Sequence, residues 1–351
     1  MKILAFSDIH CHNYPQFATR LESGLNSRLV DCLNCIKQVE TICKEREIKH
    51  VVFAGDMFKS RAKIDVDVFT ETWHRFESLS EFAEVKFLVG NHDQFTRIGD
   101  INCLEPFRNL GQVIAYPKTL RIGDYPCYGI PYTVDYEELL EAIARIPYDI
   151  KLLFMHQTLK EAIPGPDDNP GKPKFKLSDI NWDRVEKVIS GDIHRRQDLH
   201  DGKWHYLGSP LQLTFGDKDQ FKGISIIDME TLEIEGIELD SPKFYHFTVT
   251  EGGKLDVPDF DFCGADPERD FIRIKYLRDG ERLAEGLKIR YPRIIIEKYG
   301  DPKFYEDEMA ERIVGNDRAL LEEYMELNPA HDLDKERLLE FGMNELLTEI
   351  E

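Results

Sequence analysis

The chain has 351 residues, of which 42% are hydrophobic, so it is long enough for two domains with an ordinary core. No run approaches the roughly 18–20 apolar residues of a membrane-spanning helix, and the N-terminus turns polar too early for a secretory signal. The seven cysteines are odd in number and scattered, which is typical of a reducing cytosol, so we expect a cytoplasmic protein. The formal net charge of −21 argues against a free-standing nucleic-acid binder, because non-specific affinity comes from neutralising phosphates.

Five short apolar runs each end within a few residues of a side chain that can bind a metal. Runs of this kind, flanked by turn residues, predict buried strands. Helical patterns cover about 25–46, 66–82, 135–146 and 178–187, so residues 1 to about 240 read as an α/β layered domain. In chain order, residues 3–6 lead to Asp8 and His10, residues 51–54 to Asp56, residues 85–89 to Asn91, His92 and Asp93, residues 152–155 to His156, and residues 188–190 to Asp192 and His194.

These side chains predict a metal site, because ligands of open α/β sheets bind beyond the carboxyl ends of the strands. Carboxylate, imidazole and amide donors without thiolate suit Mn²⁺, Mg²⁺, Fe²⁺ or Zn²⁺. There are too many donors for one ion, so we expect a pair of ions with Asp56 as the bridge, a site suited to phosphoester hydrolysis. His92 is the candidate proton donor for the leaving oxygen, and Asp93 is expected to orient it.

The remainder of the chain differs in composition. A Pro- and Gly-rich stretch at 164–173 predicts a long exposed loop. After residue 240 we expect a small α/β capping domain at 241–301, with strands at 271–276 and 293–299 around a helix at 281–289. Residues 302–351 are acidic with apolar residues at helical spacing, which predicts a helical tail that docks on a partner. The other interpretation is a helix packed on its own domain.

The five motifs resemble the signature of calcineurin-like metallophosphoesterases. Finer features resemble the SbcD nuclease branch, including its compact phage versions: residues 55–58, 155–157 and 206–212. The resemblance implies a two-sheet αββα sandwich over residues 1–240, two divalent ions (Mn²⁺, with Mg²⁺ as the alternative) and nuclease activity on DNA ends in recombination and repair. It also implies a homodimer that binds a coiled-coil ATPase of the SbcC type through the C-terminal helices, in the host cytoplasm if the protein is phage-encoded.

The resemblance also assigns the ligands. It places Asp8, His10, Asp56 and His194 on the first ion, and Asp56, Asn91, His156 and Asp192 on the second, with His92 as the catalytic histidine. Two residues depart from the family pattern. Asp192 stands where a histidine is usual, which favours harder ions. Lys59 replaces a histidine three residues after the bridging aspartate, and lysine is a poor proton donor at neutral pH.

Basic residues gather just after the ligand candidates, so the site face could attract phosphate although the whole chain is acidic. The alternative is that these are ordinary surface residues. The candidate DNA contacts are Lys59, Arg61, Arg97, Lys172, Lys174, Arg195 and Arg196.

Three functions remain open from the sequence. The first is a metal-dependent DNA nuclease, exonuclease on double strands and endonuclease on single strands. The second is a phosphodiesterase or phosphatase for a small nucleotide or a phosphoprotein. The third is a scaffold subunit whose site is weakened by Asp192 and Lys59. The separate unit near 245–300 and the apolar acidic tail favour the first, because a small-substrate hydrolase needs neither.

Overall fold

The computed structural model describes residues 1–96, 101–165, 173–250, 254–255, 264–276, 281–291 and 294–298. No helix among these residues has both the length and the apolar character to cross a membrane. The predicted tail at 302–351 lies outside the described residues, and so does most of the predicted loop at 164–173.

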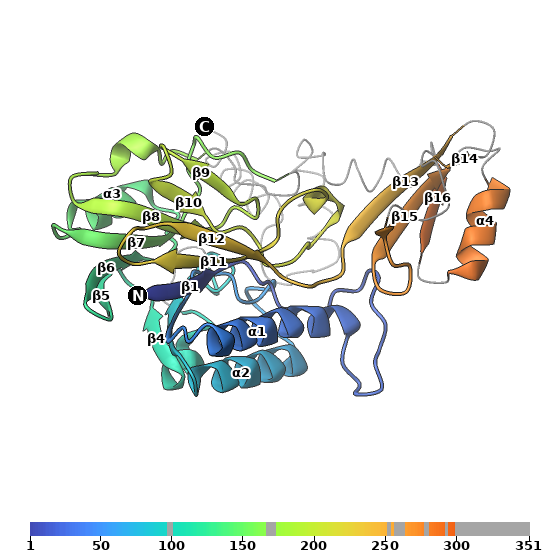
Figure 1. Cartoon of the computed structure of the whole chain (residues 1–351), viewed down its shortest axis with the longest axis horizontal. Coiled ribbons are helices and arrows are strands. Elements are labelled where there is room, and N and C mark those ends of the chain that lie inside the picture. Colours follow the sequence, from blue (N-terminus) through green and yellow to red (C-terminus); the bar gives the residue numbers. More distant parts are fainter. Residues whose placement is uncertain are drawn as a thin grey trace, which may run out of the picture. The chain divides into compact units, whose positions relative to one another are not determined.

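The first sheet has six strands in the order β12-β11-β1-β2-β3-β4 (Figure 1). Strands β1 to β4 pair in parallel, while β11 and β12 add antiparallel strands at one edge. The parallel strands are short and almost wholly buried, as expected when both faces of a sheet are covered. The bounds are β1 (Lys2–Phe6), β2 (His50–Phe53), β3 (Glu84–Leu88), β4 (Gly111–Ile114), β11 (Gly223–Asp228) and β12 (Ile234–Glu238).

The second sheet also has six strands, in the order β5-β6-β7-β8-β10-β9. Its central strands β6, β7, β8 and β10 are parallel, and the edge strands β5 and β9 are antiparallel to their neighbours. The bounds are β5 (Lys118–Ile122), β6 (Tyr125–Ile130), β7 (Ile150–His156), β8 (Val185–Gly191), β9 (Gln197–Leu199) and β10 (Trp204–Tyr206).

Three helices cover the outer faces of these sheets. Helices α1 (Ser27–Glu45) and α2 (Val66–Ser80) lie side by side (Figure 1), and α3 (Tyr136–Ala144) covers the second sheet. The Asn26 side chain caps α1 and the Asp135 side chain caps α3, each by accepting two backbone hydrogen bonds. The helix predicted at 178–187 is wrong. The segment forms a short 3₁₀ turn at Leu177–Asp179 and then enters β8, since Val185 and Val188 pair along β7.

Three hydrophobic cores show the layering. Alternate residues of β1 point to opposite faces, so Leu4 and Phe6 pack toward α1 and α2 while Ile3 and Ala5 face the second sheet. The core between the sheets joins Val52 and Leu88 to residues of the second sheet such as Phe154. A third core packs α3 on the outer face of the second sheet. The predicted αββα sandwich is therefore confirmed.

A third sheet follows, in the order β14-β13-β15-β16. Residues 1–245 and 264–272 form one compact unit, and the rest of this sheet belongs with a second unit. The predicted strand at 271–276 and helix at 281–289 are present, while the domain boundaries at 240 and 301 stay predictions. The bounds are β13 (Phe244–Thr250), β14 (Lys254–Leu255), β15 (Phe271–Tyr276), α4 (Glu281–Arg290) and β16 (Ile295–Lys298).

Candidate metal centre

The predicted ligands lie at the carboxyl ends of strands from both sheets or just beyond them. Four of them adopt the left-handed backbone region that non-glycine residues rarely visit, with φ of 56° at Asp8, 47° at His10, 62° at Asp56 and 84° at Asp192. Strained backbone of this kind persists where the surroundings hold it, and it clusters at functional sites. The sharp turns after the strands therefore direct the ligand side chains toward the carboxyl ends of the strands, a region called the rim below.

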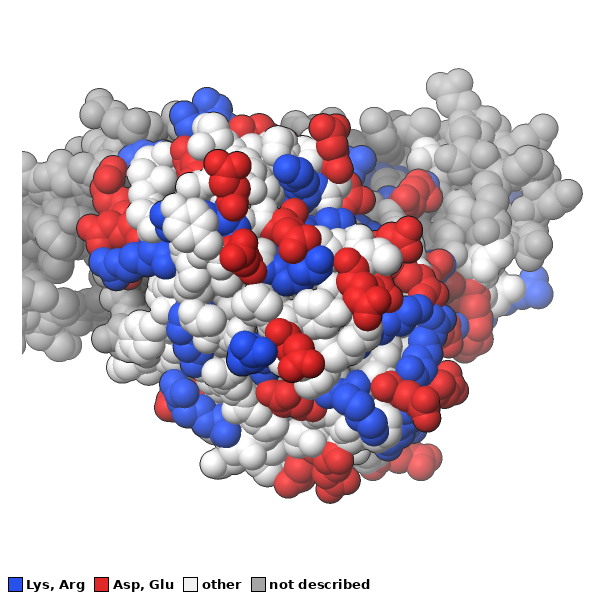
Figure 2. All heavy atoms as spheres, turned by 60° about the vertical axis from the view of Figure 1, so that its left-hand side comes forward, with Lys and Arg blue, Asp and Glu red and all other residues white. Residues whose placement is uncertain are grey.

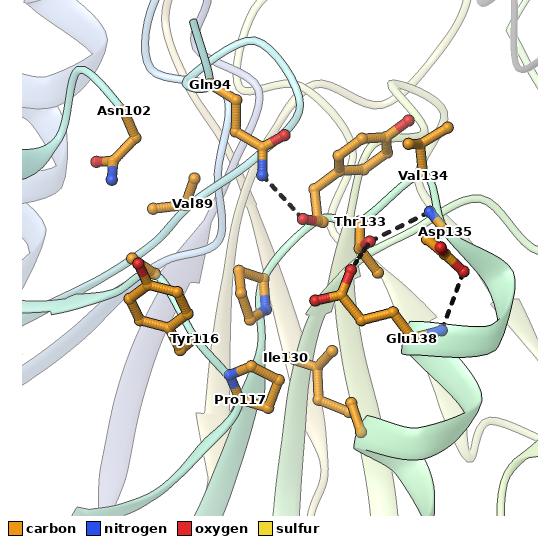
Figure 3. Close-up of a pocket in the computed structure, with 14 residues that line it drawn as sticks. Val89, Gln94, Asn102, Tyr116, Pro117, Ile130, Thr133, Val134, Asp135 and Glu138 are labelled. Atoms are coloured by element: carbon orange, nitrogen blue, oxygen red, sulfur yellow. Dashed lines mark hydrogen bonds between the residues drawn. The ribbon is translucent and has the colours of Figure 1, made fainter. Parts of the chain in front are cut away.

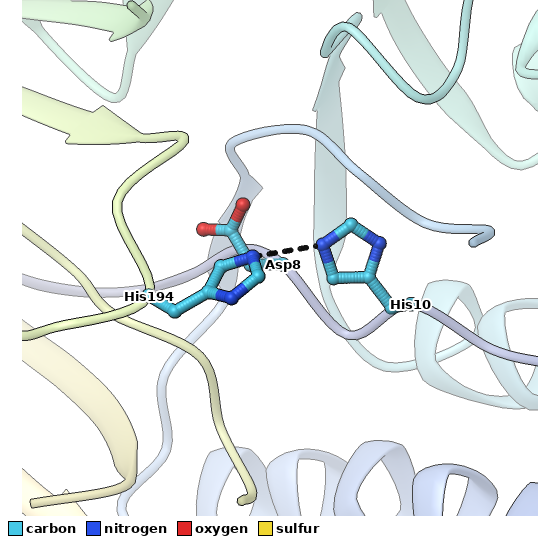
Figure 4. Close-up of side chains that lie close together, drawn as sticks. All are labelled: Asp8, His10 and His194. Atoms are coloured by element: carbon cyan, nitrogen blue, oxygen red, sulfur yellow. Dashed lines mark hydrogen bonds between the residues drawn. The ribbon is translucent and has the colours of Figure 1, made fainter. Parts of the chain in front are cut away.

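One group of ligand atoms consists of Asp8, His10 and His194 (Figure 4). Its atoms lie within 4.8 Å of one another, and the Nε2 atoms of His10 and His194 are 3.0 Å apart. The Nδ1 atom of His10 is buried and has no hydrogen-bond partner among the described residues. Two imidazoles and a carboxylate that converge in this way can hold a divalent ion.

The second group consists of Asp8, Asp56 and His156, again within 4.8 Å of one another. The Nε2 atom of His156 lies 3.3 Å from Asp56 Oδ1 and 3.9 Å from Asp8 Oδ1. Two further oxygen atoms face the same nitrogen, Asn91 Oδ1 at 3.2 Å and Asp192 Oδ1 at 3.8 Å. The structure therefore brings together all four predicted residues of the second set, and Asp192 points into it.

Asp56 lies between the two groups. Its Oδ2 atom is 3.5 Å from Nε2 of His10, and its Oδ1 atom is 3.3 Å from Nε2 of His156. The backbone N–H of His92 donates to Oδ1 at 2.8 Å and fixes the carboxylate plane. One carboxylate that faces two ligand groups is the arrangement needed to bridge a pair of ions.

Two motif glycines allow this close approach. A Cβ atom at Gly90 would lie 2.3 Å from Asp56 Oδ1, and one at Gly55 would lie 2.4 Å from Nδ1 of His156. Gly55 also has a φ of 101°, which disfavours any other residue. These glycines serve the packing of the ligands, and any larger residue would push His156 or Asp56 out of place.

The surroundings of His156 set its tautomer. Its Nδ1–H donates to the carbonyl of Ala54 at 2.7 Å, which leaves Nε2 as the lone-pair atom that faces the carboxylates. Metal-binding histidines commonly use such a second hydrogen bond to fix the ring. The backbone carbonyl of Ala54, the residue after β2, therefore orients the ring for metal binding.

The site concentrates buried charge. The side chains of Asp8, Asp56 and Asp192 are 0%, 3% and 12% exposed, and each carboxylate has an oxygen within 3.9 Å of Nε2 of His156. Burial raises the pKa of Asp8 to about 6 and also raises that of Asp192. Burial alone would also raise the pKa of Asp56 and would lower the pKa of His156. The attraction between the Asp56 carboxylate and the His156 imidazolium is stronger, so the pKa of Asp56 is low and that of His156 is high. Divalent cations would compensate these carboxylates.

Metal affinity should rise with pH. A bound ion needs Asp8 as carboxylate and His156 as neutral imidazole, and both have a raised pKa in the metal-free protein. Each proton displaced makes the affinity increase by up to about tenfold per pH unit until the pKa is passed. We expect calorimetric Mn²⁺ titrations to show weaker binding and greater proton release at pH 5.5 than at pH 8. Equal affinity at both values would contradict this account.

His92 lies at the rim, with its ring centroid 4.9 Å from that of His10. Its Nδ1–H donates to the carbonyl of Lys59 at 2.7 Å, so the Nε2 atom is available to a substrate. Asp93 does not orient this ring as predicted. Its carboxylate is turned inward and accepts hydrogen bonds from the backbone N–H groups of Asp56, Met57 and Gly90. Asp93 therefore ties two ligand loops together, and the Lys59 carbonyl holds His92.

Two supporting residues were not found from the sequence. The hydroxyl of Thr158 donates to Asp192 Oδ2 and holds that carboxylate toward His156. The buried ammonium of Lys222 donates to the carbonyl of His194 at 2.9 Å, to Ser209 at 2.8 Å and to Asp217 at 2.5 Å. The backbone N–H of Ser209 donates to the same His194 carbonyl at 3.1 Å. This network explains the segment at 206–212 as a support for the His194 loop.

Replacing Lys222 with methionine should destabilise the protein by about 3–5 kcal/mol, because it leaves the Asp217 carboxylate buried without its partner. It should also weaken metal binding, because the His194 loop loses a donor. Chemical denaturation and a Mn²⁺ titration measure the two effects. The double variant Lys222→Met with Asp217→Asn should recover part of the stability, since it removes both charges and keeps an acceptor for the N–H of Leu213. No recovery would show that the ion pair is not the source of the loss.

The candidate DNA contacts differ in their exposure. Lys59, Lys174 and Arg195 are exposed, Arg61 is half-buried, and Arg97 and Lys172 lie outside the described residues. Arg196, a candidate DNA contact, is half-buried and is engaged within the protein. Its guanidinium donates to Ser225 at 2.8 Å and lies 4.9 Å from the ring centroid of Phe221. On the face in Figure 2, basic and acidic side chains are interspersed, so that face does not form a one-signed surface for DNA.

Three solved structures with similarity to this chain share little sequence with it. One is GAP50, described as the anchor in the inner membrane complex of Plasmodium, at 10% identity and a TM-score of 0.35, covering 69% of this chain and 89% of that one. Another is purple acid phosphatase PPD1 from yellow lupin (Lupinus luteus) seeds, at 12% identity and 0.40, covering 67% and 52%. A third is Yfce, a phosphoesterase from E. coli, at 10% identity and 0.32, covering 68% and 100%.

No curated protein matches the sequence. Residues 1–196 match the family described as calcineurin-like phosphoesterase, and this range includes every predicted metal ligand. The match covers more than half of the 351 residues. The chain therefore belongs to the calcineurin-like phosphoesterases, which use two divalent metal ions.

Proposed function

We propose that this protein is a metal-dependent phosphodiesterase that cleaves DNA as the nuclease subunit of an SbcC–SbcD-like complex. The observation that carries the phosphodiesterase part is the position of Asp56, whose two oxygens face His10 on one side and His156 on the other. The choice of DNA as substrate rests on the resemblance of residues 55–58, 155–157 and 206–212 to the SbcD branch.

In this proposal Asp8, His10, Asp56 and His194 would hold one ion, and Asp56, Asn91, His156 and Asp192 the other. Two divalent ions supply an activated hydroxide and a positive clamp on the phosphate oxygens. Mn²⁺ is the proposed ion, because three carboxylates, an amide and imidazoles form a set of hard and borderline donors, and Mg²⁺ is the alternative. Asp93, Thr158 and Lys222 hold the loops that carry these ligands.

His92 is the proposed proton donor to the leaving oxygen. Because Nδ1 is bonded to the Lys59 carbonyl, the proton is delivered from Nε2. Burial lowers the pKa of His92, whereas the carboxylate of Asp56 acts in the opposite sense. The negative charge of a bound phosphodiester would favour the protonated ring further. The protonated ring can therefore give its Nε2 proton to the leaving oxygen, becomes neutral in doing so, and regains a proton from water before the next turnover.

A partner would resolve the conflict between DNA as substrate and a net charge of −21. We propose that residues 302–351 dock on a coiled-coil ATPase that supplies DNA-binding surface, and that the complex contains a homodimer of this chain. Removal of residues 302–351 should abolish association with the ATPase in a pull-down while hydrolysis of a small diester continues. Retained association would refute the docking role.

The same ligand geometry also suits a phosphodiesterase or phosphatase that acts on small nucleotides. The test is an assay with end-labelled double-stranded DNA, circular single-stranded DNA, bis(4-nitrophenyl) phosphate and 4-nitrophenyl phosphate, in Mn²⁺ or Mg²⁺, with and without the ATPase. We expect Mn²⁺-dependent cleavage of DNA that the ATPase stimulates and that a chelator abolishes. Hydrolysis of the nitrophenyl esters without DNA cleavage, even with the ATPase, would favour the small-substrate function.

A further inference from the structure

The two ligand groups differ in how their histidine rings are held. The Nδ1–H of His156 donates to the carbonyl of Ala54 at 2.7 Å, which is the usual way of fixing a metal-binding imidazole. The Nδ1 atom of His10 is buried and has no hydrogen-bond partner among the described residues. His10 also has a φ of 47°, in a region that a non-glycine residue keeps only where its surroundings hold it. The orientation of the His10 ring therefore depends on how its backbone is held.

The two groups also differ in what lies beside them. A pocket of about 290 Å³ lies on the side of His156 (Figure 3), since its lining includes Tyr132, whose ring centroid is 6.4 Å from that of His156. On the side of His10, Tyr14 is half-buried and packs against the core between the first sheet and helices α1 and α2. The first ligand group therefore has a packed aromatic side chain behind its loop.

Tyr14 holds the backbone of His10. Its hydroxyl donates to the His10 carbonyl at 2.9 Å, and the N–H of His10 donates to the carbonyl of Asp56 at 3.2 Å. The Tyr14 carbonyl in turn accepts a hydrogen bond from the side chain of Asn26 at 2.9 Å. His10 is therefore hydrogen-bonded on both sides of its Cα atom. These bonds oppose the backbone rotation that would turn its ring away from His194.

Arg28 holds the ring of Tyr14. This residue is only 6% exposed, and its guanidinium lies 4.2 Å from the ring centroid of Tyr14. The guanidinium also lies 5.2 Å from the ring centroid of Phe244 and 5.0 Å from that of Phe271, and it donates to the carbonyl of Leu213 at 2.9 Å. A cation that is removed from water attracts the faces of aromatic rings more strongly than an exposed one. The buried guanidinium therefore fixes the position from which the Tyr14 hydroxyl donates.

The contact with Leu213 connects Arg28 to the support of the other imidazole in the first group. The N–H of Leu213 donates to Asp217 at 2.8 Å, and Asp217 pairs with Lys222. Lys222 donates to the carbonyl of His194 at 2.9 Å. One connected network thus reaches the backbone carbonyls of both histidines whose Nε2 atoms face each other.

We infer that Tyr14 is a positioning residue for His10 and that it thereby sets the affinity of the first metal ion. The inference rests on the proposed function, because it takes His10 and His194 to hold that ion. The hydroxyl contacts neither ion nor substrate in this account, and acts by keeping the His10 imidazole directed at His194. The second ion should depend on Tyr14 much less, because His156 has its own support from the carbonyl of Ala54.

The test is Tyr14→Phe, which keeps the ring beside Arg28 and removes only the hydroxyl. Calorimetric titration of the full-length protein with Mn²⁺ gives the affinities, and anomalous diffraction at limiting Mn²⁺ shows which position loses its ion. We expect binding near His10 and His194 to weaken about tenfold, the lower end of the range for a residue that supports a ligand. The peak on the side of His156 should then be the stronger of the two by a larger ratio than in the wild type.

Tyr136→Phe is the matched control. Tyr136 is also half-buried, and its hydroxyl donates to Asp179 at 3.0 Å, a bond that joins α3 to the turn at 177–179 and involves no predicted ligand. Both variants should unfold cooperatively without metal, and Tyr136→Phe should bind Mn²⁺ as the wild type does. Unchanged affinity for both ions in Tyr14→Phe would overturn the positioning role. Weakening of the second ion alone, or an equal loss in Tyr136→Phe, would overturn it as well.

The wild type separates this result from the fate of the proposed function. If it binds two Mn²⁺ ions but hydrolyses neither DNA nor any other diester, the proposed function fails, and the affinities of Tyr14→Phe still decide the role of Tyr14. If it hydrolyses diesters and Tyr14→Phe binds both ions normally, only the positioning role fails. A wild type without an ion near His10 and His194 would overturn both.

Discussion

Replacing Asp56 with alanine should remove hydrolysis and leave the protein unable to hold two ions. Both oxygens of this carboxylate are used, since Oδ2 faces His10 and Oδ1 faces His156. Loss of one electrostatic donor already costs ~10²–10³-fold in rate, so loss of a shared ligand should cost more than about 10³-fold. Diester hydrolysis and Mn²⁺ stoichiometry by calorimetry measure the two effects.

The control for this variant is Asp201→Ala. Asp201 is exposed and has a φ of 54°, close to the 62° of Asp56, so it reproduces the backbone change without touching the site. Circular dichroism should show that both variants are folded. If Asp56→Ala still bound two Mn²⁺ ions and hydrolysed the diester at the wild-type rate, the ligand assignment would be wrong.

His92→Gln should slow DNA cleavage by ~10²–10⁴-fold, the usual contribution of a general acid, without loss of metal. Its effect should depend on the leaving group. A 4-nitrophenolate ion leaves without protonation, so hydrolysis of bis(4-nitrophenyl) phosphate should fall far less than cleavage of DNA, where an alkoxide must leave. The measurement is kcat for both substrates in the two proteins.

His200→Gln serves as the comparison, since His200 is exposed and is neither a predicted metal ligand nor the proposed proton donor. A loss of bound Mn²⁺ in His92→Gln would make His92 a ligand. Equal loss of activity on both substrates would also contradict proton donation, because such a loss indicates damage to the metal centre.

The sequence was informative where structure follows from local pattern. Short apolar runs that end in a turn predicted the parallel strands, and the carboxyl ends of such strands share one edge of a sheet. This is why Asp8 and Asp56, which follow the neighbouring parallel strands β1 and β2, could be placed together before the fold was known. His156 ends β7 of the second sheet, and the structure brings it to the same place. The same argument put Asp192 beside His156, where its Oδ1 lies 3.8 Å from Nε2.

The contacts that orient the ligands could not be predicted from the sequence pattern. Asp93 was expected to orient His92, but its carboxylate accepts hydrogen bonds from backbone N–H groups, and the Lys59 carbonyl orients His92 instead. The Lys222 network depends on contacts across 13 and 28 residues, and hydrophobic periodicity carries no signal for such contacts. The apolar spacing around Val185 fitted a helix, but pairing with β7 decided the outcome.

Anomalous diffraction from crystals soaked in Mn²⁺ tests the central claim most directly. The account predicts two peaks ~3.5–4 Å apart on either side of the Asp56 carboxylate, one near His10 and His194 and the other near Asn91 and His156. It also predicts that Asp192 contacts the second peak. A single peak, or two peaks that do not share Asp56, would contradict a two-metal phosphoesterase centre at this rim.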